Sequence, residues 1–222
     1  MTVDAEKPSG PRSSKGERTR AKLLRAAKEI FEEHGFIEAR ISDIAERAGL
    51  SYGSFYHYFS SKEEIFHEVA ALHERRLAQA VLDDVANAKS PGDRASELVA
   101  AQFVAANRRF LAEYRDEARL MRVIEQVARY DATLAKARGR RHDAYAQRLA
   151  DAIRRLQGEG SVDRDIDPSV GSQAIMALVT QFAEGWFVQE RISCDFEDGV
   201  AQVNRLCLNA LGMSALLEGT EP

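Results

Sequence analysis

Residues 41–59, ISDIAERAGLSYGSFYHYF, contain two short helical patterns separated by a tight turn. In the first pattern Ile44 and Ala48 lie one helical turn apart, with charged residues between them. Gly49 can adopt the positive φ that lets a chain reverse directly after a helix. Ser51 can then cap a second helix by accepting a hydrogen bond from a free amide of its first turn. The stretch therefore predicts a helix-turn-helix, the arrangement that lays a second helix in the major groove of DNA.

The expected second helix, residues 52–59, carries hydroxyls and an imidazole but no carboxylate. Phe55 and Phe59 are one turn apart and predict an inward face, which leaves Tyr56 and His57 on the outer face. A phosphate surface accepts hydrogen-bond donors and repels acids, so this composition favours nucleic acid. The same residues also suit a small hydrophobic core, because aromatic clusters on short helices commonly pack inward. Spacing alone leaves both interpretations open.

Residues 18–69 resemble the N-terminal domain of the TetR family of transcriptional regulators. The matching segments are RTRAKLLRAAKEIFEEHGF, ISDIAERAGLS and YGSFYHYFSSKEEIF. An aromatic-rich second helix, an aromatic-His-aromatic-Phe run and a Ser-Lys-Glu helix start are together specific for this family. The resemblance covers about the first third of the chain. The sequence departs from the family at Arg40-Ile41-Ser42, where paired threonines are common. Ser42 can still cap the first helix of the motif.

The resemblance implies an all-α homodimer that binds a palindromic, double-stranded DNA operator. It also implies that a small apolar or amphipathic effector enters a C-terminal helical bundle, moves the linking helix and so releases the DNA. The residues expected to contact bases or position the backbone on DNA are Ser42, Ser51, Tyr52, Gly53, Ser54, Tyr56, His57, Tyr58 and Lys62.

The expected organisation follows from breaks in composition and helical pattern. We expect a disordered arm over residues 1–15, a DNA-binding domain over 16–60, a linking helix over 61–90, and a ligand-binding and dimerisation domain over 91–217. Phe36 and Ile37 are expected to fill the core of the small first domain. Ser60-Ser61 followed by two glutamates is a strong start signal for the linking helix.

The rest of the chain shows helical periodicity and no strand pattern. Further helices are expected at about 94–114, 118–130, 132–157, 168–191 and 195–211. Asp167-Pro168 supplies an N-cap followed by proline at the first helical position. The helix over 168–191 carries two neighbouring apolar ridges, a face wider than one partner helix needs. It can close the monomer's core, or it can form a four-helix dimer interface together with the helix over 195–211.

The charge distribution is uneven although the net charge is −4. Residues 12–25 hold six basic residues and one acid, which is typical of a DNA-contacting end on an acidic body. The sequence contains no apolar run long enough to span a membrane and no signal-peptide core, so we expect a cytoplasmic protein. Cys194 and Cys207 are expected to be buried, reduced thiols.

No arrangement of side chains in the sequence suggests catalysis. The histidines are scattered, no Cys/His cluster has zinc spacing, and no glycine-rich phosphate loop follows a strand. We therefore expect neither enzymatic activity nor a metal or other cofactor.

The second domain is instead a candidate for a ligand cavity between facing helices. Its expected lining is Phe103, Asn107, Met121, Glu125, Tyr145, Met176, Gln181, Phe182 and Trp186. Methionine and aromatic residues at these positions can equally be ordinary core. Arg138, Arg140 and Arg141 can serve an acidic ligand such as an acyl-CoA, or they can form a solvated helix face.

The sequence leaves alternatives to an effector-released repressor. The chain can be a DNA-binding activator or architectural protein without an inducer, or a helical interaction module or enzyme with a vestigial DNA-binding head. A protected palindrome near a promoter distinguishes the last of these from the others.

Overall fold

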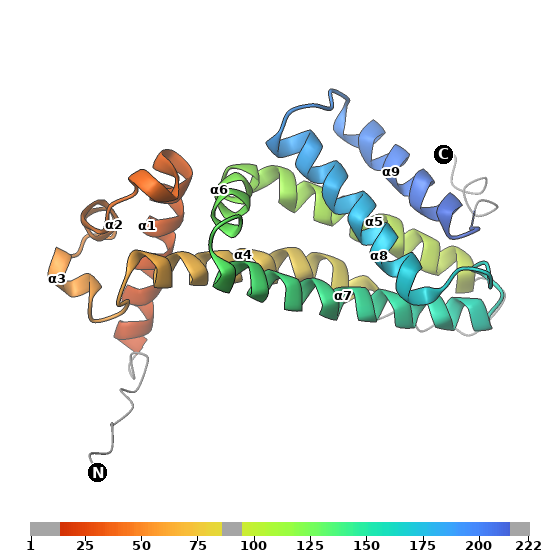
Figure 1. The fold of residues 1–222 in the computed structure, drawn as a ribbon, viewed down its shortest axis with the longest axis horizontal. Coiled ribbons are helices and arrows are strands. Elements are labelled where there is room, and N and C mark those ends of the chain that lie inside the picture. Colours follow the sequence, from red (N-terminus) through yellow and green to blue (C-terminus); the bar gives the residue numbers. More distant parts are fainter. Residues whose placement is uncertain (1–13, 86–94, 214–222) are drawn as a thin grey trace, which may run out of the picture. The chain divides into compact units, whose positions relative to one another are not determined.

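The computed structural model describes residues 14–85 and 95–213, and all regular elements within these residues are helical (Figure 1). The chain divides into two units, residues 1–73 and 74–222. The elements in order are α1 (Ser14–Glu38), α2 (Ile41–Arg47), α3 (Tyr52–Phe55), α4 (Lys62–Val85), α5 (Ala95–Asp116), α6 (Ala118–Ala128), α7 (Ala132–Gly158), α8 (Pro168–Ala183), the π-helix η1 (Glu184–Val188) and α9 (Phe196–Ala210). The predicted all-α fold, a helix-turn-helix followed by a helical domain, is confirmed.

Two sequence predictions fall outside the described residues. The expected N-terminal arm coincides largely with residues 1–13, and the expected break after the linking helix coincides with residues 86–94. Among the described residues, none of the helices is long and apolar enough to cross a membrane.

The core of the first unit is built on α1. Its buried residues include Leu23, Ala27, Ile30 and Phe31, whose spacing places them on one side of the helix. Gly35 then leaves helical geometry with φ of 73° and ψ of 176°, a conformation that a side chain would strain. The glycine therefore ends the regular part of α1, as the sequence predicts.

The chain after Gly35 returns to the core through residues that the sequence only partly identifies. The ring of Phe36 packs against Phe31 and Phe66, with centroids 5.8 and 4.9 Å away. Ile37 is 75 % exposed, so the prediction that it fills the core is wrong, and Ala39 is buried instead. The bend at Gly35 changes the phase of the chain, which explains why an extrapolated apolar pattern fails here.

The turn between α2 and α3 follows the sequence prediction closely. Gly49 has φ of +69°, and the Ser51 side chain caps α3 by accepting from the amide of Ser54 at 3.3 Å. Ser42 is not the cap of α2, because Arg40 occupies that position and makes no side-chain cap bond. The Ser42 hydroxyl instead donates to Asp43 at 2.8 Å.

The helical segment of α3 is shorter than predicted. It ends at Phe55 rather than at residue 59. The amides of Tyr58 and Phe59 still donate to the Phe55 carbonyl at 2.9 and 3.1 Å, so the chain continues as a turn. Phe55 and Phe59 are both buried, which anchors this turn to the core as expected.

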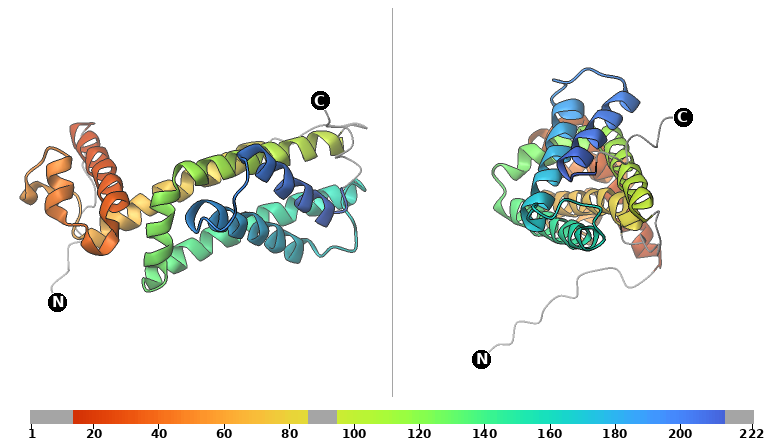
Figure 2. Two further views of the ribbon diagram at one scale, coloured as in Figure 1. Left: turned by 90° about the horizontal axis from the view of Figure 1, so that it is seen from above. Right: turned by 90° about the vertical axis from the view of Figure 1, so that its right-hand side faces the viewer.

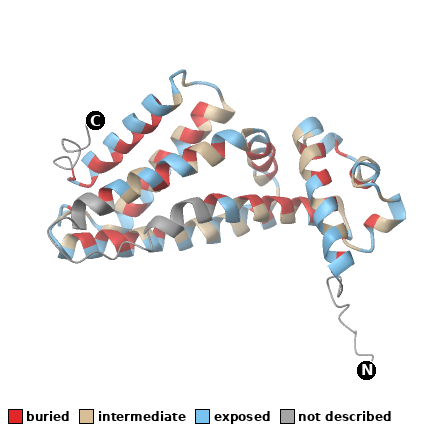
Figure 3. Ribbon diagram, turned by 180° about the vertical axis from the view of Figure 1, so that it is seen from behind, coloured by how far each residue is buried: buried red, intermediate tan, exposed pale blue. Residues whose placement is uncertain are grey.

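The second unit gathers α5, α7, α8 and α9 around one another (Figure 2). Aspartates cap three of its helices: Asp131 accepts from two amides of α7, Asp167 from two amides of α8, and Asp195 from one amide of α9. Each carboxylate also lies at the positive end of a helix dipole, which stabilises the start of that helix. In α9, buried and exposed residues alternate along the helix (Figure 3).

The end of α8 differs from the prediction of one helix to residue 191. The α-helix stops at Ala183 and a π-helical turn, η1, follows to Val188. Trp186 in η1 stacks on Phe187 and Phe196, with centroids 4.4 and 5.9 Å away. A π-turn shifts the phase of the residues that follow it, which here brings the indole into this aromatic cluster.

The two cysteines lie in different surroundings. Cys207 is buried in α9, as predicted, and burial raises the pKa of its thiol to about 12. Cys194 is exposed in the segment between η1 and α9, so the prediction that it is buried is wrong. Its segment is not helical, and an apolar helical environment was the basis of that prediction.

Candidate nucleic-acid interface and ligand cavity

Tyr52 and Tyr56 form an exposed aromatic pair on α3. They are 55 % and 45 % exposed, their rings meet edge to face at 5.3 Å, and their hydroxyls are hydrogen-bonded at 2.8 Å. The bond to Tyr52 raises the pKa of the Tyr56 hydroxyl above its ordinary value of 10.0. His57 is also exposed beside the pair. This surface therefore offers neutral donors and acceptors at fixed positions and no acid.

The entry to α3 is shaped by small residues. Ser51 and Ser54 join their hydroxyls at 2.7 Å, so each orients the other. Gly53 is exposed, and a Cβ built on it would meet nothing within 4 Å. The glycine is therefore not required by the packing of the protein itself. Tyr58 is only partly exposed.

Lys62 has a structural task within the first unit. Its ammonium donates to the carbonyls of Phe36, Ile37 and Ala39 at 2.8, 3.0 and 2.9 Å. It also lies 4.7 Å from the centroid of the Phe36 ring. An ammonium has three N–H donors and all three are used here, so a phosphate contact by Lys62 would require one of these bonds to break, and the expected DNA contact stays a prediction.

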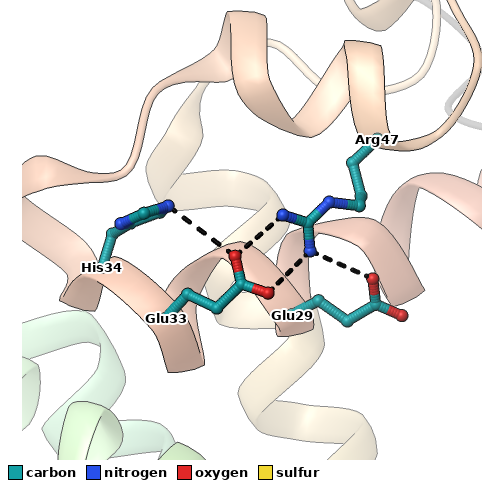
Figure 4. Close-up of polar contacts among 4 residues, drawn as sticks. All are labelled: Glu29, Glu33, His34 and Arg47. Carbon is teal, nitrogen blue, oxygen red and sulfur yellow. Dashed lines mark hydrogen bonds and ion pairs between the residues drawn. The ribbon is translucent and has the colours of Figure 1, made fainter.

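Arg47 holds the end of α2 against α1 (Figure 4). Its guanidinium donates twice to Glu33 at 2.8 Å and contacts Glu29 at 3.4 Å. The bond from Arg47 lowers the pKa of the Glu33 carboxyl. His34 lies 3.7 Å from the same carboxylate. A two-point contact of this kind fixes orientation as well as distance, so it positions the turn that leads into α3.

A second arginine joins α1 to α4 in the same unit. Arg20 binds Glu68 through both of its terminal nitrogens and lies 4.9 Å over the Phe59 ring. Its charge is thus paired within the first unit.

The second unit contains a cavity of about 210 Å³ between α4, α5, α7 and α8. Its walls are mainly apolar and include Phe103, Ala106, Phe110, Ile175 and Val179. Such a space, apolar with a few convergent polar groups, is typical of a small-molecule site.

One wall of the cavity carries a charged cluster. Arg138 on α7 lies 3.2 Å from Glu74 of α4 and donates to Glu125 of α6 at 2.5 Å. Arg141, one turn further along α7, also pairs with Glu74. Burial raises the pKa of Glu74, and the two arginines partly oppose that shift. Burial lowers the pKa of Arg138, but its pairing with Glu125 and Glu74 outweighs burial and the net shift is upward.

Four of the predicted ligand residues line this cavity, namely Phe103, Asn107, Tyr145 and Met176. The lining also includes His142, Arg148 and Thr180, which the sequence analysis did not select. His142 lies one turn from Arg138, and Arg148 lies two turns from Arg141, so extending the arginine pattern at helical spacing would have found them.

The other predicted ligand residues lie outside the cavity lining. Met121 is buried in the core, Glu125 is bound to Arg138, and Gln181 is exposed and bonded to Glu184 at 3.3 Å. Phe182 packs on Trp186, at 5.2 Å between centroids, in the aromatic cluster at the end of α8. Helical phase correctly predicted that Met121 and Trp186 are buried, but they pack in the core and not along the cavity. Gln181 faces solvent.

Asn107 has a partner that the sequence did not reveal. Its side-chain amide donates to Asn204 of α9 at 2.8 Å, and both residues are buried. A buried amide needs such a partner, so this bond fixes α9 beside α5 at the cavity wall.

The fold and the surface of α3 define a helix-turn-helix DNA-binding protein with a cavity-bearing helical domain. Residues 23–69 match the family model described as bacterial regulatory proteins, tetR family. Residues 82–195 match the model of the tetracyclin repressor-like C-terminal domain. The chain belongs to the TetR family of DNA-binding transcriptional regulators.

Relatives of known sequence agree with this assignment. The transcriptional repressor KstR2 of Mycolicibacterium smegmatis is 34% identical over 124 residues, covering 54% of this chain and 57% of KstR2. The regulator YdgC of Bacillus subtilis is 43% identical over 72 residues, 31% of this chain, and the match spans only 37% of YdgC. The match to UidR of Escherichia coli K12 is 23% identical and covers 72% of this chain and 77% of UidR.

Solved structures share the fold at low sequence identity. The fatty acid degradation regulator FadR of Bacillus halodurans has a TM-score of 0.68 at 20% identity, covering 92% of this chain and 98% of FadR. A SmeT–triclosan complex has a TM-score of 0.69 at 21% identity, covering 87% of this chain and 91% of SmeT. SmeT is described as the repressor of a multidrug efflux pump of Stenotrophomonas maltophilia.

Proposed function

We propose that the protein is a homodimeric repressor that binds a two-fold DNA operator and leaves it when a small apolar or amphipathic molecule enters the second unit. The observation that carries the proposal is the exposed, acid-free surface of α3. Tyr52, Tyr56 and His57 would face base edges or flanking phosphates. Ser42, Ser51, Ser54 and Tyr58 would position the backbone, and Gly53 would permit close approach.

Dimerisation is supported by apolar side chains left exposed on α8 and α9. Val170 is 67 % exposed and Leu206 is 55 % exposed, and Ala174, one turn after Val170, is exposed as well. A single α3 can contact only a few bases. Two copies related by a two-fold axis would read two half-sites about 34–36 Å apart, one turn of DNA.

Release by an effector is supported by the cavity beside α4. SmeT, which shares this fold, has been solved in complex with triclosan, so a protein of this fold accommodates a small molecule. For release to follow from binding, the ligand must bind the DNA-incompetent state of this protein more tightly than the DNA-competent state. An activator without an inducer would bind the same kind of operator but would show no such coupling.

The DNA-binding part is tested by selecting bound duplexes from a random pool and measuring affinity by fluorescence anisotropy. Tyr56→Ala and His57→Ala should each weaken binding to the selected DNA by about 1–3 kcal/mol, while the dimer remains intact by sedimentation. Tyr130→Ala is the matched control, because Tyr130 is an exposed tyrosine of the second unit. Equal affinity of wild type and the α3 variants would contradict the proposed surface.

A further inference from the structure

The charges around the cavity are distributed unevenly. The residues along α7 that line it include three arginines, Arg138, Arg141 and Arg148, and His142. Arg138 and Arg141 are three residues apart and Arg141 and Arg148 are seven apart, which places the arginines on one face of the helix. Among the described residues that line the cavity, Glu74 carries the one carboxylate. The rest of the described lining is mainly apolar, with Asn107, Tyr145 and Thr180 as uncharged polar residues, so the cavity has a largely apolar body and an electropositive side.

Arg141 has a buried hydrogen-bond donor that lacks an acceptor. Its terminal nitrogen pairs with Glu74, but its Nε is buried and has no hydrogen-bond partner. A guanidinium presents its N–H groups as a planar fork that matches the two oxygens of a carboxylate or phosphate. A buried donor without an acceptor lowers the stability of the protein. An anion that accepts a hydrogen bond from this Nε would remove that cost, and this would favour its binding.

Glu74 occupies the place that such an anion would take. It contacts both Arg138 and Arg141, and its side chain is only 13% exposed. Arg138 has a second carboxylate partner in Glu125 and would stay paired if Glu74 moved away. Arg141 has no second acidic partner among the ion pairs of the described residues, so it is the group that an incoming anion can take over.

We propose that the cavity selects amphipathic anions, in which an apolar chain fills the cavity and one carboxylate or phosphate head binds Arg141 in exchange for Glu74. This inference rests on the proposed effector function and names the chemical class of the effector. The same exchange couples the ligand to α4, because Glu74 belongs to that helix and α4 begins at Lys62 in the first unit. Releasing Glu74 removes two contacts that hold α4 to α7.

The test compares three probes that share one alkyl chain: decanoate, decan-1-ol and decyltrimethylammonium. Isothermal titration calorimetry of the full-length protein without DNA should show decanoate binding about tenfold or more tighter than decanol, with the cation weakest. Arg141→Gln should abolish the preference for decanoate and leave decanol binding unchanged. Glu74→Gln should tighten decanoate binding severalfold, because the competing carboxylate has lost its charge.

Arg140→Gln is the matched control, since Arg140 neighbours Arg141 on α7 but is exposed and is not in the cavity lining. It should retain the full preference for decanoate. If Arg141→Gln alone unfolds, the double variant Glu74→Gln/Arg141→Gln also removes the buried charge that would have lost one of its two arginine partners, and it should bind decanoate and decanol equally. A preference for decanoate that survives in the double variant, or tighter binding of decanol or of the cation by wild type, would overturn the inference.

The same probes added to the protein–DNA complex separate this inference from the proposed function. If decanoate shows the Arg141-dependent preference but leaves the DNA bound, the ligand class stands and release by an effector is wrong. If decanol releases DNA as well as decanoate does, release by an effector stands and the anion preference is wrong. Failure of all three probes to bind would overturn the cavity as a ligand site.

Discussion

Trp186 lies directly against Gly199, so that a Cβ on the glycine would be 2.2 Å from Cη2 of the indole. Gly199 is in the first turns of α9, and the indole is held on its other sides by Phe187 and Phe196. The ring is buried and rigid, so it has little freedom to move away. The close approach of α9 to η1 therefore depends on a residue without a side chain.

Gly199→Ala should lower the free energy of unfolding by about 1–3 kcal/mol, because overpacking forces the ring or the helix to shift. The measurement is the urea unfolding midpoint, followed by the fluorescence of the single tryptophan. Gly139→Ala in α7 is the control, because a Cβ there meets nothing within 4 Å and alanine favours helix. It should be neutral or stabilising. A Gly199→Ala protein as stable as wild type would show that the indole is free to move.

Lys62→Met should destabilise the first unit and leave the salt dependence of DNA binding unchanged. The ammonium satisfies three carbonyls that follow the bend at Gly35, and losing it should cost about 1–3 kcal/mol. Hydrogen exchange of the first unit and the slope of log K against log salt are the two measurements. Lys136→Met, an exposed lysine of α7, is the control for stability. A flatter slope with unchanged stability would identify Lys62 as a phosphate contact.

Glu64 makes the start of α4 sensitive to acid. Its carboxylate accepts from the hydroxyl and the amide of Ser60, at 2.5 and 2.6 Å, and these bonds lower the pKa of Glu64 below its ordinary value of 4.5. The stability that they provide is therefore fully present above pH 4.5 and is lost as the pH falls through the lowered pKa. Glu64→Gln should be less stable than wild type at pH 7, and the difference should shrink below about pH 4.

Melting temperature against pH for wild type and Glu64→Gln measures this effect. The control is Glu63→Gln in the same turn of α4, which should follow the wild-type profile. If the melting temperature of Glu64→Gln differed from that of wild type by the same amount at every pH, the effect of the substitution would come from packing rather than from charge.

The cysteines should react very differently with a thiol reagent. Cys194 is exposed and should be modified in the native protein, whereas Cys207 is buried with its pKa raised to about 12 and should react only on unfolding. At pH 8 we expect one reactive thiol per chain in the native protein and two in denaturant. Two rapid native thiols would mean that α9 opens readily.

Local signals in the sequence predicted local structure well. The cap at Ser51, the positive φ of Gly49 and the Asp167-Pro168 helix start each depend on residues within a few positions of one another. Ser42 does not cap α2 because the helix begins two residues earlier than that role requires, with Arg40 at the cap position. Competition between two equally plausible starts is decided by the packing of the whole first unit.

Contacts between distant residues were beyond what helical phase can predict. Lys62 meets carbonyls from residues 36–39, and Arg20 meets Glu68, because the fold of the first unit brings them together. Phe182 and Trp186 share a face with residues that line the cavity, yet Trp186 lies against Gly199 of α9 and Phe182 packs on Trp186. Phase shows which side of a helix is inward, and only the tertiary arrangement shows whether that side meets core, cavity or another helix.

The central claim is that two copies of the α3 surface read DNA as a symmetric pair. A hydroxyl-radical footprint of the protein on its selected duplex measures this most directly. The claim predicts two protected half-sites of mirror-related sequence about one helical turn apart, both of them lost with Tyr56→Ala. A single, asymmetric protected segment, or protection that persists unchanged in Tyr56→Ala, would contradict it.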